Sequence, residues 1–199
     1  MNEKGLDHAH RRGGSDNFVA GDRGHNSAGG KMIARSGSGR WHNLMVSNMS
    51  VASGSKMHGH KCEIYISNMR VMLTNNFVCY PDIVFVSGEP KFSDGNQDML
   101  LNPTAVVEIF SSTTNTVDKT KKVESFLGME SIRECVLLKE DEMRVEHYAR
   151  QNQKQWIYRI YNERDDVISL DSIGVKVSLS EIYAQIKFRQ AEFTSRAVN

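Results

Sequence analysis

Two acidic residues, Asp82 and Glu108, lie inside apolar stretches of this chain, and three lysines follow them. Asp82 stands in YPDIVFVS and Glu108 stands in NPTAVVEIFS. A carboxylate among apolar neighbours is costly to bury unless it is paired or bound to a metal. Two carboxylates on neighbouring strands can hold a hard divalent cation such as Mg²⁺, which prefers oxygen ligands. Such an ion, with an ammonium group from Lys119, Lys121 or Lys122, is suited to cleaving a phosphodiester bond.

A plainer interpretation of the same residues stays open. Asp82 follows Pro81, and a Pro-Asp pair before a strand is ordinary turn chemistry. Glu108 would then form a buried salt bridge in the core, with Lys122 as its partner. The spacing of the residues alone does not decide between the metal site and this structural arrangement.

The acidic residues are expected on strands. The run around Glu108, residues 104–111, is almost continuously apolar, which is typical of a central strand covered on both faces. Residues 77–88, FVCYPDIVFVSG, predict a longer strand in which Pro81 is accepted because no ladder hydrogen bond is lost there. The Gly-, Pro- and Asn-containing residues 88–103 between the two predict a surface loop.

Two helices are expected beside these strands. Residues 41–57 predict a helix whose apolar stripe contains Met45, Met49 and Ala52, widened by Leu44. Residues 117–127 predict a second helix, which carries the lysines and ends at Gly128. The apolar stripe of this second helix consists of Val117, Val123, Phe126 and Leu127.

The remaining segments read mostly as strands. They are CEIYIS, MRVMLT, the hairpin of RECVLLK and MRVEHYAR, QWIYRIYN, VISLDS and VKVSL, with KMIAR at residues 31–35 as a further short strand. A short helix, SLSEIYAQIKF, closes the fold, with Ser178 or Ser180 and Glu181 as an N-cap signal. Trp156, Tyr158 and Tyr161 alternate unevenly, which favours core and rim positions over a base-stacking platform.

Composition limits the classes of protein that fit. The 199 residues carry 25 basic and 24 acidic side chains, a net charge of +1, so bulk charge does not indicate a general nucleic-acid binder. No apolar run is long enough for a membrane span. The three scattered cysteines fit a cytoplasmic protein with buried thiols. The polar, glycine-rich residues 1–28 and the end segment 189–199 are expected to be tails around one domain at 29–188.

Several motifs together resemble the Uma family, type two, of bacterial endonucleases in the PD-(D/E)xK superfamily. They are YPDIVFVSG, NPTAVVEIFSSTT, VDKTKKVESF, the hairpin SIRECVLLKEDEMRVEHYAR and the closing VSLSEIY. Upstream, HNLMVSNM and CEIYISNMRV resemble the first helix and the following strands of that family. The resemblance covers about residues 29–188, and the order of the motifs is more specific than any one of them.

The resemblance implies an α/β (α+β) fold with a mixed sheet flanked by helices. It implies an endonuclease that cleaves DNA with Mg²⁺ or Mn²⁺ and acts as a cytoplasmic homodimer. Carried over by position, Asp82 and Glu108 are the metal ligands and Lys122 is the lysine of the site. The usual lysine position, two residues after the glutamate, holds Phe110 here. His42, Lys119 and Lys121 are candidate substrate contacts, although a capping or packing role is also open for His42.

Three departures from the family pattern are visible. Lys31 stands where the family has an acid, Ser112 replaces a proline, and no helix of the family type precedes residue 29. These departures support an alternative function, a catalytically inactive relative that binds nucleic acid or protein. The sequence places Asp82, Glu108 and Lys122 in the family order, which favours the enzyme.

Overall fold

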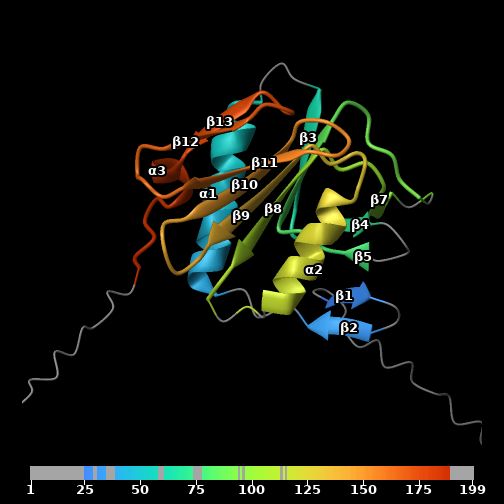
Figure 1. Cartoon of the computed structure of the whole chain (residues 1–199), viewed down its shortest axis with the longest axis horizontal. Helices are drawn as coiled ribbons and strands as arrows, with labels where there is room; N and C mark the ends of the chain where they lie inside the picture. Colours follow the sequence, from blue (N-terminus) through green and yellow to red (C-terminus); the bar gives the residue numbers. More distant parts are fainter. Residues whose placement is uncertain are drawn as a thin grey trace, which may run out of the picture.

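A six-stranded mixed sheet forms the centre of the molecule (Figure 1). The computed structural model describes residues 39–57, 61–73, 78–93, 95, 97–112, 114 and 116–188, and the backbone of 25–28 and 31–34. The strand order of the sheet is β11-β10-β9-β8-β6-β3, and only β8 and β9 pair in parallel. Its strands are β3 (Cys62–Ile66), β6 (Ile83–Ser87), β8 (Ala105–Phe110), β9 (Glu134–Lys139), β10 (Val145–Arg150) and β11 (Trp156–Tyr161).

Two smaller sheets accompany the central one. The first has the order β2-β1-β5-β4-β7 and is built from short strands. They are β1 (His25–Ala28), β2 (Lys31–Ala34), β4 (Arg70–Met72), β5 (Val78–Cys79) and β7 (Met99–Leu100). The second is the hairpin of β12 (Val167–Leu170) and β13 (Val175–Ser178).

Helices cover both faces of the central sheet, because each face carries its own apolar cluster. Helix α1 (Arg40–Gly54) packs on one face together with the β12–β13 hairpin and the short helix α3 (Leu179–Ile182). Helix α2 (Thr116–Leu127) packs on the other face beside β4, β5 and β7. Among the described residues, no helix has both the length and the apolar character that a membrane crossing requires.

Strand β8 occupies the middle of the sheet, and all six of its residues are buried. Val107 and Ile109 belong to the cluster on the α1 face, whereas Val106 and Phe110 belong to the cluster on the α2 face. The prediction of a central strand covered on both faces is therefore confirmed. Alternation places Glu108, between Val107 and Ile109, on the α2 face.

Most expected elements are present. The predicted helices over 41–57 and 117–127 correspond to α1 and α2, and the 134–150 hairpin corresponds to β9 and β10. Ser178 caps α3, and Glu181 completes the capping box. The mixed α and β fold predicted from the sequence is thereby confirmed.

Four expectations about individual segments need correction. The predicted strand over 77–88 is two strands in different sheets, β5 and β6, because the chain leaves the ladder around Pro81. The predicted loop 88–103 contains β7, which pairs with β4. Val117 is 56% exposed, so it does not belong to the buried stripe of α2. The closing helix is only four residues long.

The N-terminal expectation also changes in part. β1 begins at His25, inside the segment 1–28 that was expected to be a tail, and β2 fits the strand expected at 31–35. Residues 1–24 of that expected tail lie outside the described residues. The tail expected at 189–199 lies outside them as well.

Candidate active site

The two acidic residues meet at one end of the central sheet. β6 and β8 are antiparallel neighbours in which Ile83 faces Val107 and Val84 faces Val106. Continued by one residue, this register places Asp82 opposite Glu108, and directly opposed residues of antiparallel strands share a face. Asp82 is 2% exposed and Glu108 is 3% exposed. The structure thus brings together two buried carboxylates that lie 26 residues apart in the sequence.

Asp82 is held from several elements. The backbone amide of Ile109 donates a hydrogen bond of 2.9 Å to Asp82 Oδ2, and His42 Nε2 lies 3.1 Å from the same oxygen. The backbone carbonyl of Asp82 accepts a hydrogen bond of 2.8 Å from Ser67 N. Because β8, the first turn of α1 and the loop after β3 all contact Asp82, its position is fixed by the fold. An isolated turn would not constrain the residue in this way.

Lys122 approaches the carboxylates from α2. Its Nζ lies 2.7 Å from Glu108 Oε1, and its side chain is only 14% exposed. Burial lowers the pKa of Lys122, but Glu108, with smaller contributions from Cys79 and Asp82, raises that pKa above its ordinary value. Lys122 is therefore protonated at neutral pH and can donate hydrogen bonds or neutralise charge, but it is unsuited to act as a base. The Glu108–Lys122 ion pair anticipated as an alternative is present.

The three candidate substrate contacts lie in different environments. His42 contacts Asp82, so it belongs to the support of the carboxylate rather than to a helix cap. Lys119 Nζ pairs with Glu146 at 3.3 Å and lies 5.6 Å from the centre of the Phe110 ring. Lys121 is exposed on α2. Lys119 and Lys121 lie within one turn of Lys122, at the border of the site.

The donor set suits a hard cation. Asp82 and Glu108 offer carboxylate oxygens at one place, and Mg²⁺ is commonly bound by one or two carboxylates with water and substrate phosphate completing the shell. Within the described part of the chain, no cluster of three or more His, Cys, Asp or Glu side chains is arranged to hold a metal. A cation held by Asp82 and Glu108 would therefore have oxygen ligands from these two carboxylates, which matches the preference of Mg²⁺ more closely than that of Zn²⁺.

Sequence reasoning missed Cys79, which is fully buried near this site. Burial raises the pKa of the Cys79 thiol, and Lys122 and Glu108 are the charged groups that act on it most strongly, in opposite directions. The same cause raises the pKa of Cys135, so both remain neutral thiols. Cys79 lies only three residues before Asp82 in the sequence, and this closeness was the available signal. Because both residues were expected on one strand, whereas the strand that holds Cys79 and the strand that follows Asp82 belong to different sheets, the position of Cys79 near the site was not predicted.

A third buried carboxylate, that of Glu134, has contacts that serve the packing of the fold. It accepts hydrogen bonds from the backbone amides of Asp171 at 3.2 Å and Ser172 at 3.0 Å, and from the Ser172 hydroxyl. His147 Nε2 lies 3.2 Å from it. These contacts fasten the β12–β13 turn to β9. They distinguish Glu134 from the pair at Asp82 and Glu108.

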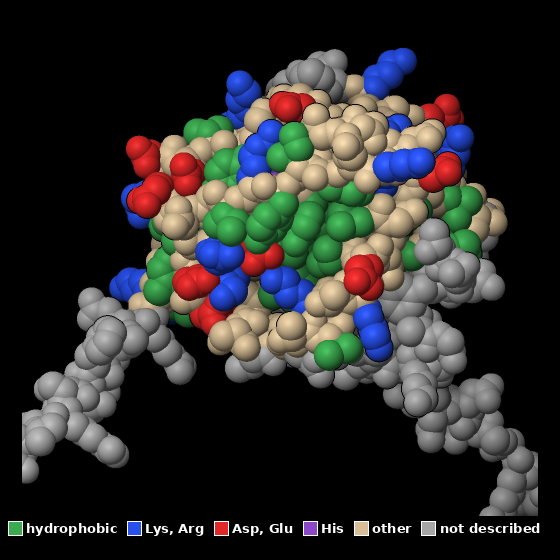
Figure 2. All heavy atoms as spheres, viewed as in Figure 1, with side chains coloured by type: hydrophobic (Ala, Val, Ile, Leu, Met, Phe, Trp, Pro, Cys, Tyr) green, Lys and Arg blue, Asp and Glu red, His purple; other side chains and the backbone are tan. Residues whose placement is uncertain are grey.

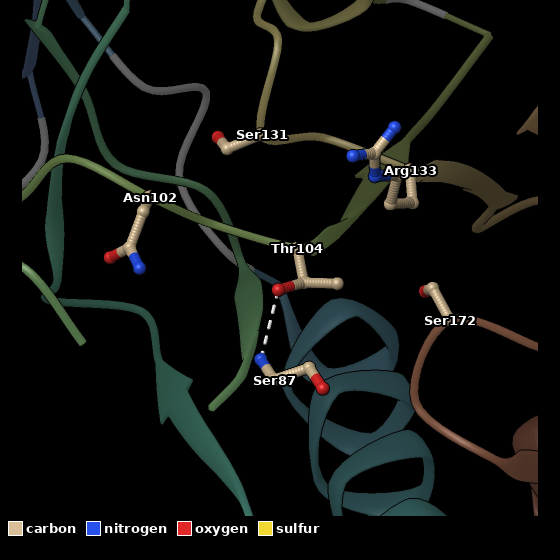
Figure 3. Close-up of a pocket in the computed structure, with 6 residues that line it drawn as sticks. All are labelled: Ser87, Asn102, Thr104, Ser131, Arg133 and Ser172. Carbon is tan, nitrogen blue, oxygen red and sulfur yellow. Dashed lines mark hydrogen bonds between the residues drawn. The ribbon is translucent and has the colours of Figure 1, made fainter. Parts of the chain in front are cut away.

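A polar hollow of about 480 Å³ lies at the other end of the strands (Figure 3). Its lining consists of Ser87, Asn102, Thr104, Ser131, Arg133 and Ser172. Ser87 ends β6, whereas Asp82 precedes the first residue of that strand. Ser87 N donates a hydrogen bond of 2.8 Å to Thr104 Oγ1, which closes part of the wall. The carboxylate pair is therefore outside this hollow.

Comparison with known proteins gives consistent matches. The profile of the Uma2 family, described as "Putative restriction endonuclease", matches residues 22–180. The uncharacterized proteins sll1609 and slr1290 of Synechocystis sp. are 29% and 24% identical to this chain over 129 and 161 residues. Those matches cover 64% of this chain and 73% of sll1609, and 80% of this chain and 83% of slr1290.

One solved structure has the same fold. It is titled a putative nuclease belonging to DUF820 from Anabaena variabilis, and it superposes with a TM-score of 0.69 at 17% sequence identity. The superposition covers 83% of this chain and 92% of the other.

Proposed function

Because this chain belongs to the Uma2 family, whose description is "Putative restriction endonuclease", we propose that it hydrolyses phosphodiester bonds of DNA with a divalent cation held by Asp82 and Glu108. Mg²⁺ is the cation that we expect, and Mn²⁺ is the alternative that a two-carboxylate site accepts. Asp82, Glu108 and Lys122 are the proposed catalytic residues.

The observation that carries this proposal is the opposed pair of buried carboxylates with the Lys122 ammonium beside it. Like charges directly opposite on neighbouring strands repel each other. Lys122 supplies one positive charge beside the two carboxylates, and His42 adds a second only when it is protonated, so a divalent cation would be electrostatically favoured at this position. A pair of acids kept in this arrangement is better explained by ligand binding than by folding, because buried charges contribute little net stability.

Each residue has a distinct proposed role. A bound divalent cation would supply charge to the scissile phosphate and lower the pKa of a coordinated water. Asp82 and Glu108 would hold it, while the Ile109 amide and His42 keep Asp82 Oδ2 in place. Lys122 would donate a hydrogen bond to the attacking water or to a phosphate oxygen. Because Lys122 is protonated, we assign it charge neutralisation and orientation, not proton abstraction.

Cleavage of plasmid DNA in the presence of Mg²⁺ or Mn²⁺ tests the proposal. We expect Glu108→Gln to lower the cleavage rate by about 100-fold or more, because the variant loses a metal ligand and the charge that orients Lys122. Glu124→Gln, an exposed carboxylate on α2, is the matched control and should cleave at the wild-type rate. Equal rates for Glu108→Gln and the wild type would contradict the site assignment. DNA binding without cleavage by the wild type would instead favour the inactive binding relative.

The homodimeric state and the cytoplasmic location expected from the sequence remain predictions. Light scattering on the purified chain measures the first, and fractionation of the source cells measures the second. A monomer at all accessible concentrations would contradict the dimer.

A further inference from the structure

An aromatic surface that the described residues leave uncovered lies on the α2 face of the central sheet. Helix α2 packs over β9, while β10 and β11 continue the sheet beyond it. Tyr148 faces Tyr158 across the β10–β11 pair, and their ring centres are 4.9 Å apart. Tyr158 is 46% exposed and Ile160 is 44% exposed, although both are large apolar residues. Figure 2 shows hydrophobic side chains gathered over this part of the sheet, with basic and acidic side chains along its border.

This aromatic surface is continuous with the candidate active site. Phe110 lies two residues after Glu108 on the same face of β8, and Lys119 Nζ lies 5.6 Å from the centre of its ring. Lys119 then pairs with Glu146, which is two residues before Tyr148 on β10. Phe110 itself is buried, so a ligand that extends from the carboxylates along this face would pass Lys119 on the way to the tyrosines.

The charges around the aromatic surface are mainly positive. Lys119 and Arg144 both pair with Glu146, at 3.3 and 3.5 Å, so one acid is shared by two cations. Although burial lowers the pKa of Arg144, Glu146 and the Tyr158 hydroxyl raise that pKa above its ordinary value. Arg150 adds a third cation, whose guanidinium lies 4.2 Å from the centre of the Trp156 ring.

From this geometry we infer that the aromatic surface binds a single-stranded segment of nucleic acid next to the proposed cleavage site. Bases stack on exposed aromatic rings irrespective of sequence, and neighbouring basic side chains contact the phosphates. The sequence had favoured core and rim positions for Trp156 and Tyr158, and the exposure of Tyr158 is the reason for assigning it a binding role. This inference deepens the proposed nuclease function by naming the strand state of its substrate.

A second copy of this chain is the other occupant to consider, because β11 is an edge strand. The charge distribution disfavours it, since a two-fold contact would bring two surfaces with an excess of positive charge against each other. An anionic strand complements the same excess. The nucleic-acid assignment therefore agrees with both the rings and the charges.

Binding of a fluorescently labelled oligo-dT strand, measured by anisotropy in EDTA, tests the inference without any requirement for cleavage. We expect Tyr158→Ala to weaken binding by roughly tenfold through the lost stacking, and Tyr158→Phe to bind as the wild type does. Arg144→Ala should weaken binding and reduce its salt dependence, whereas Arg159→Ala, on the opposite face of β11, should have little effect.

Because strand binding is measured in EDTA, it does not require the proposed metal site, which separates this inference from the proposed catalytic function. A second readout uses Trp41→Phe, which leaves Trp156 as the single indole, and its fluorescence should change when the strand binds. The inference is overturned if Tyr158→Ala binds oligo-dT as tightly as the wild type, or if a matched duplex binds more tightly than the single strand. A shift from dimer to monomer in Tyr158→Ala with unchanged oligo-dT binding would identify a second copy as the occupant.

Discussion

At the scale of single residues, the candidate site depends on the contacts that hold the Asp82 carboxylate in place. Its Oδ2 is shared by an amide of β8 and by His42 of α1, so the carboxylate is oriented from two layers of the fold. Residues that orient a ligand without binding the metal usually affect metal affinity nearly as strongly as some ligands do. We therefore propose that His42 is a positioning residue for Asp82.

His42→Ala should weaken Mn²⁺ binding by about 10- to 100-fold, because Asp82 loses the contact that orients it. Titration calorimetry of Mn²⁺ into both proteins measures the change. Val51→Ala, an exposed substitution on the same helix, is the control and should bind as the wild type does. Unchanged affinity in His42→Ala would assign His42 to packing alone.

At the scale of elements, α2 carries both the lysine of the site and the apolar residues that attach it to the sheet. Phe126 is fully buried in the cluster on this face, and Val123 is buried beside it. Val117 lies at the start of the helix and is mostly exposed. The C-terminal half of α2 therefore anchors it, while the turn near Lys119 borders the aromatic surface.

Phe126→Ala should lower the free energy of unfolding by about 3 to 5 kcal/mol, because a large cavity opens under α2. Val117→Ala removes an exposed side chain and should change it by no more than about 0.5 kcal/mol. Urea denaturation of the two variants and the wild type gives the comparison. A large loss of stability in Val117→Ala would instead indicate that Val117 belongs to the buried stripe predicted from the sequence.

The capping box of α3 gives the fold a pH-dependent element. Hydrogen bonding from Lys56, and then from Ser178, lowers the pKa of Glu181 below its ordinary value. A carboxyl whose pKa is lower in the folded state stabilises the fold above its unfolded pKa, and that stabilisation is lost as the pH falls through the folded pKa. Stability should therefore fall less steeply from about pH 6 to about pH 3 in Glu181→Gln than in the wild type. Thermal melts of both proteins across that pH range measure the difference. If stability fell equally steeply with pH in Glu181→Gln and in the wild type, Glu181 would not be the source of the pH dependence.

Local signals predicted the elements well where one segment is enough to define them. The continuous apolar run of β8, the amphipathic pattern of α1 and the turn between β9 and β10 each lie within one short window. The division at Pro81 was missed, because β-propensity on its two sides is similar and the choice of a different sheet for β5 depends on distant partners. β7 was missed because two residues define a strand only when β4 is beside them.

Prediction of the candidate site from the sequence is limited in the same way. Asp82 and Glu108 were found because acids in apolar runs are unusual, and Lys122 was placed by resemblance to a family. Their closeness rests on the pairing of β6 with β8, which is a long-range property of the sheet. The contact of His42 with Asp82 joins residues 40 positions apart on different elements, and no local pattern indicates it.

At the scale of the whole molecule, the proposed metal site joins two layers that pack on opposite faces of the sheet. Asp82 is contacted from α1, and Glu108 is contacted from α2. A metal ion that binds only the folded state stabilises that state by mass action. Here the residues that would bind the ion come from strands covered by both layers. Metal binding is therefore expected to be visible in global unfolding.

Mn²⁺ at about 100 times its dissociation constant should raise the free energy of unfolding by about 2.7 kcal/mol, and the melting temperature should rise accordingly. Differential scanning calorimetry with Mn²⁺ and with EDTA measures the effect. Asp82→Asn should abolish the metal-dependent rise, whereas Glu130→Gln, which is exposed, should keep it. An equal rise in Asp82→Asn would place the stabilising metal elsewhere.

The division of the chain at Pro81 has a mechanical consequence. Cys79 ends a strand of the small sheet, and Asp82 immediately precedes a strand of the large one, so three peptide links join the two sheets there. Pro81 fixes one backbone torsion of this connection, which limits its flexibility. A displacement of the small sheet would be transmitted to the Asp82 carboxylate and alter its spacing from Glu108. The position of Asp82 in the proposed active site would therefore depend on the placement of the small sheet.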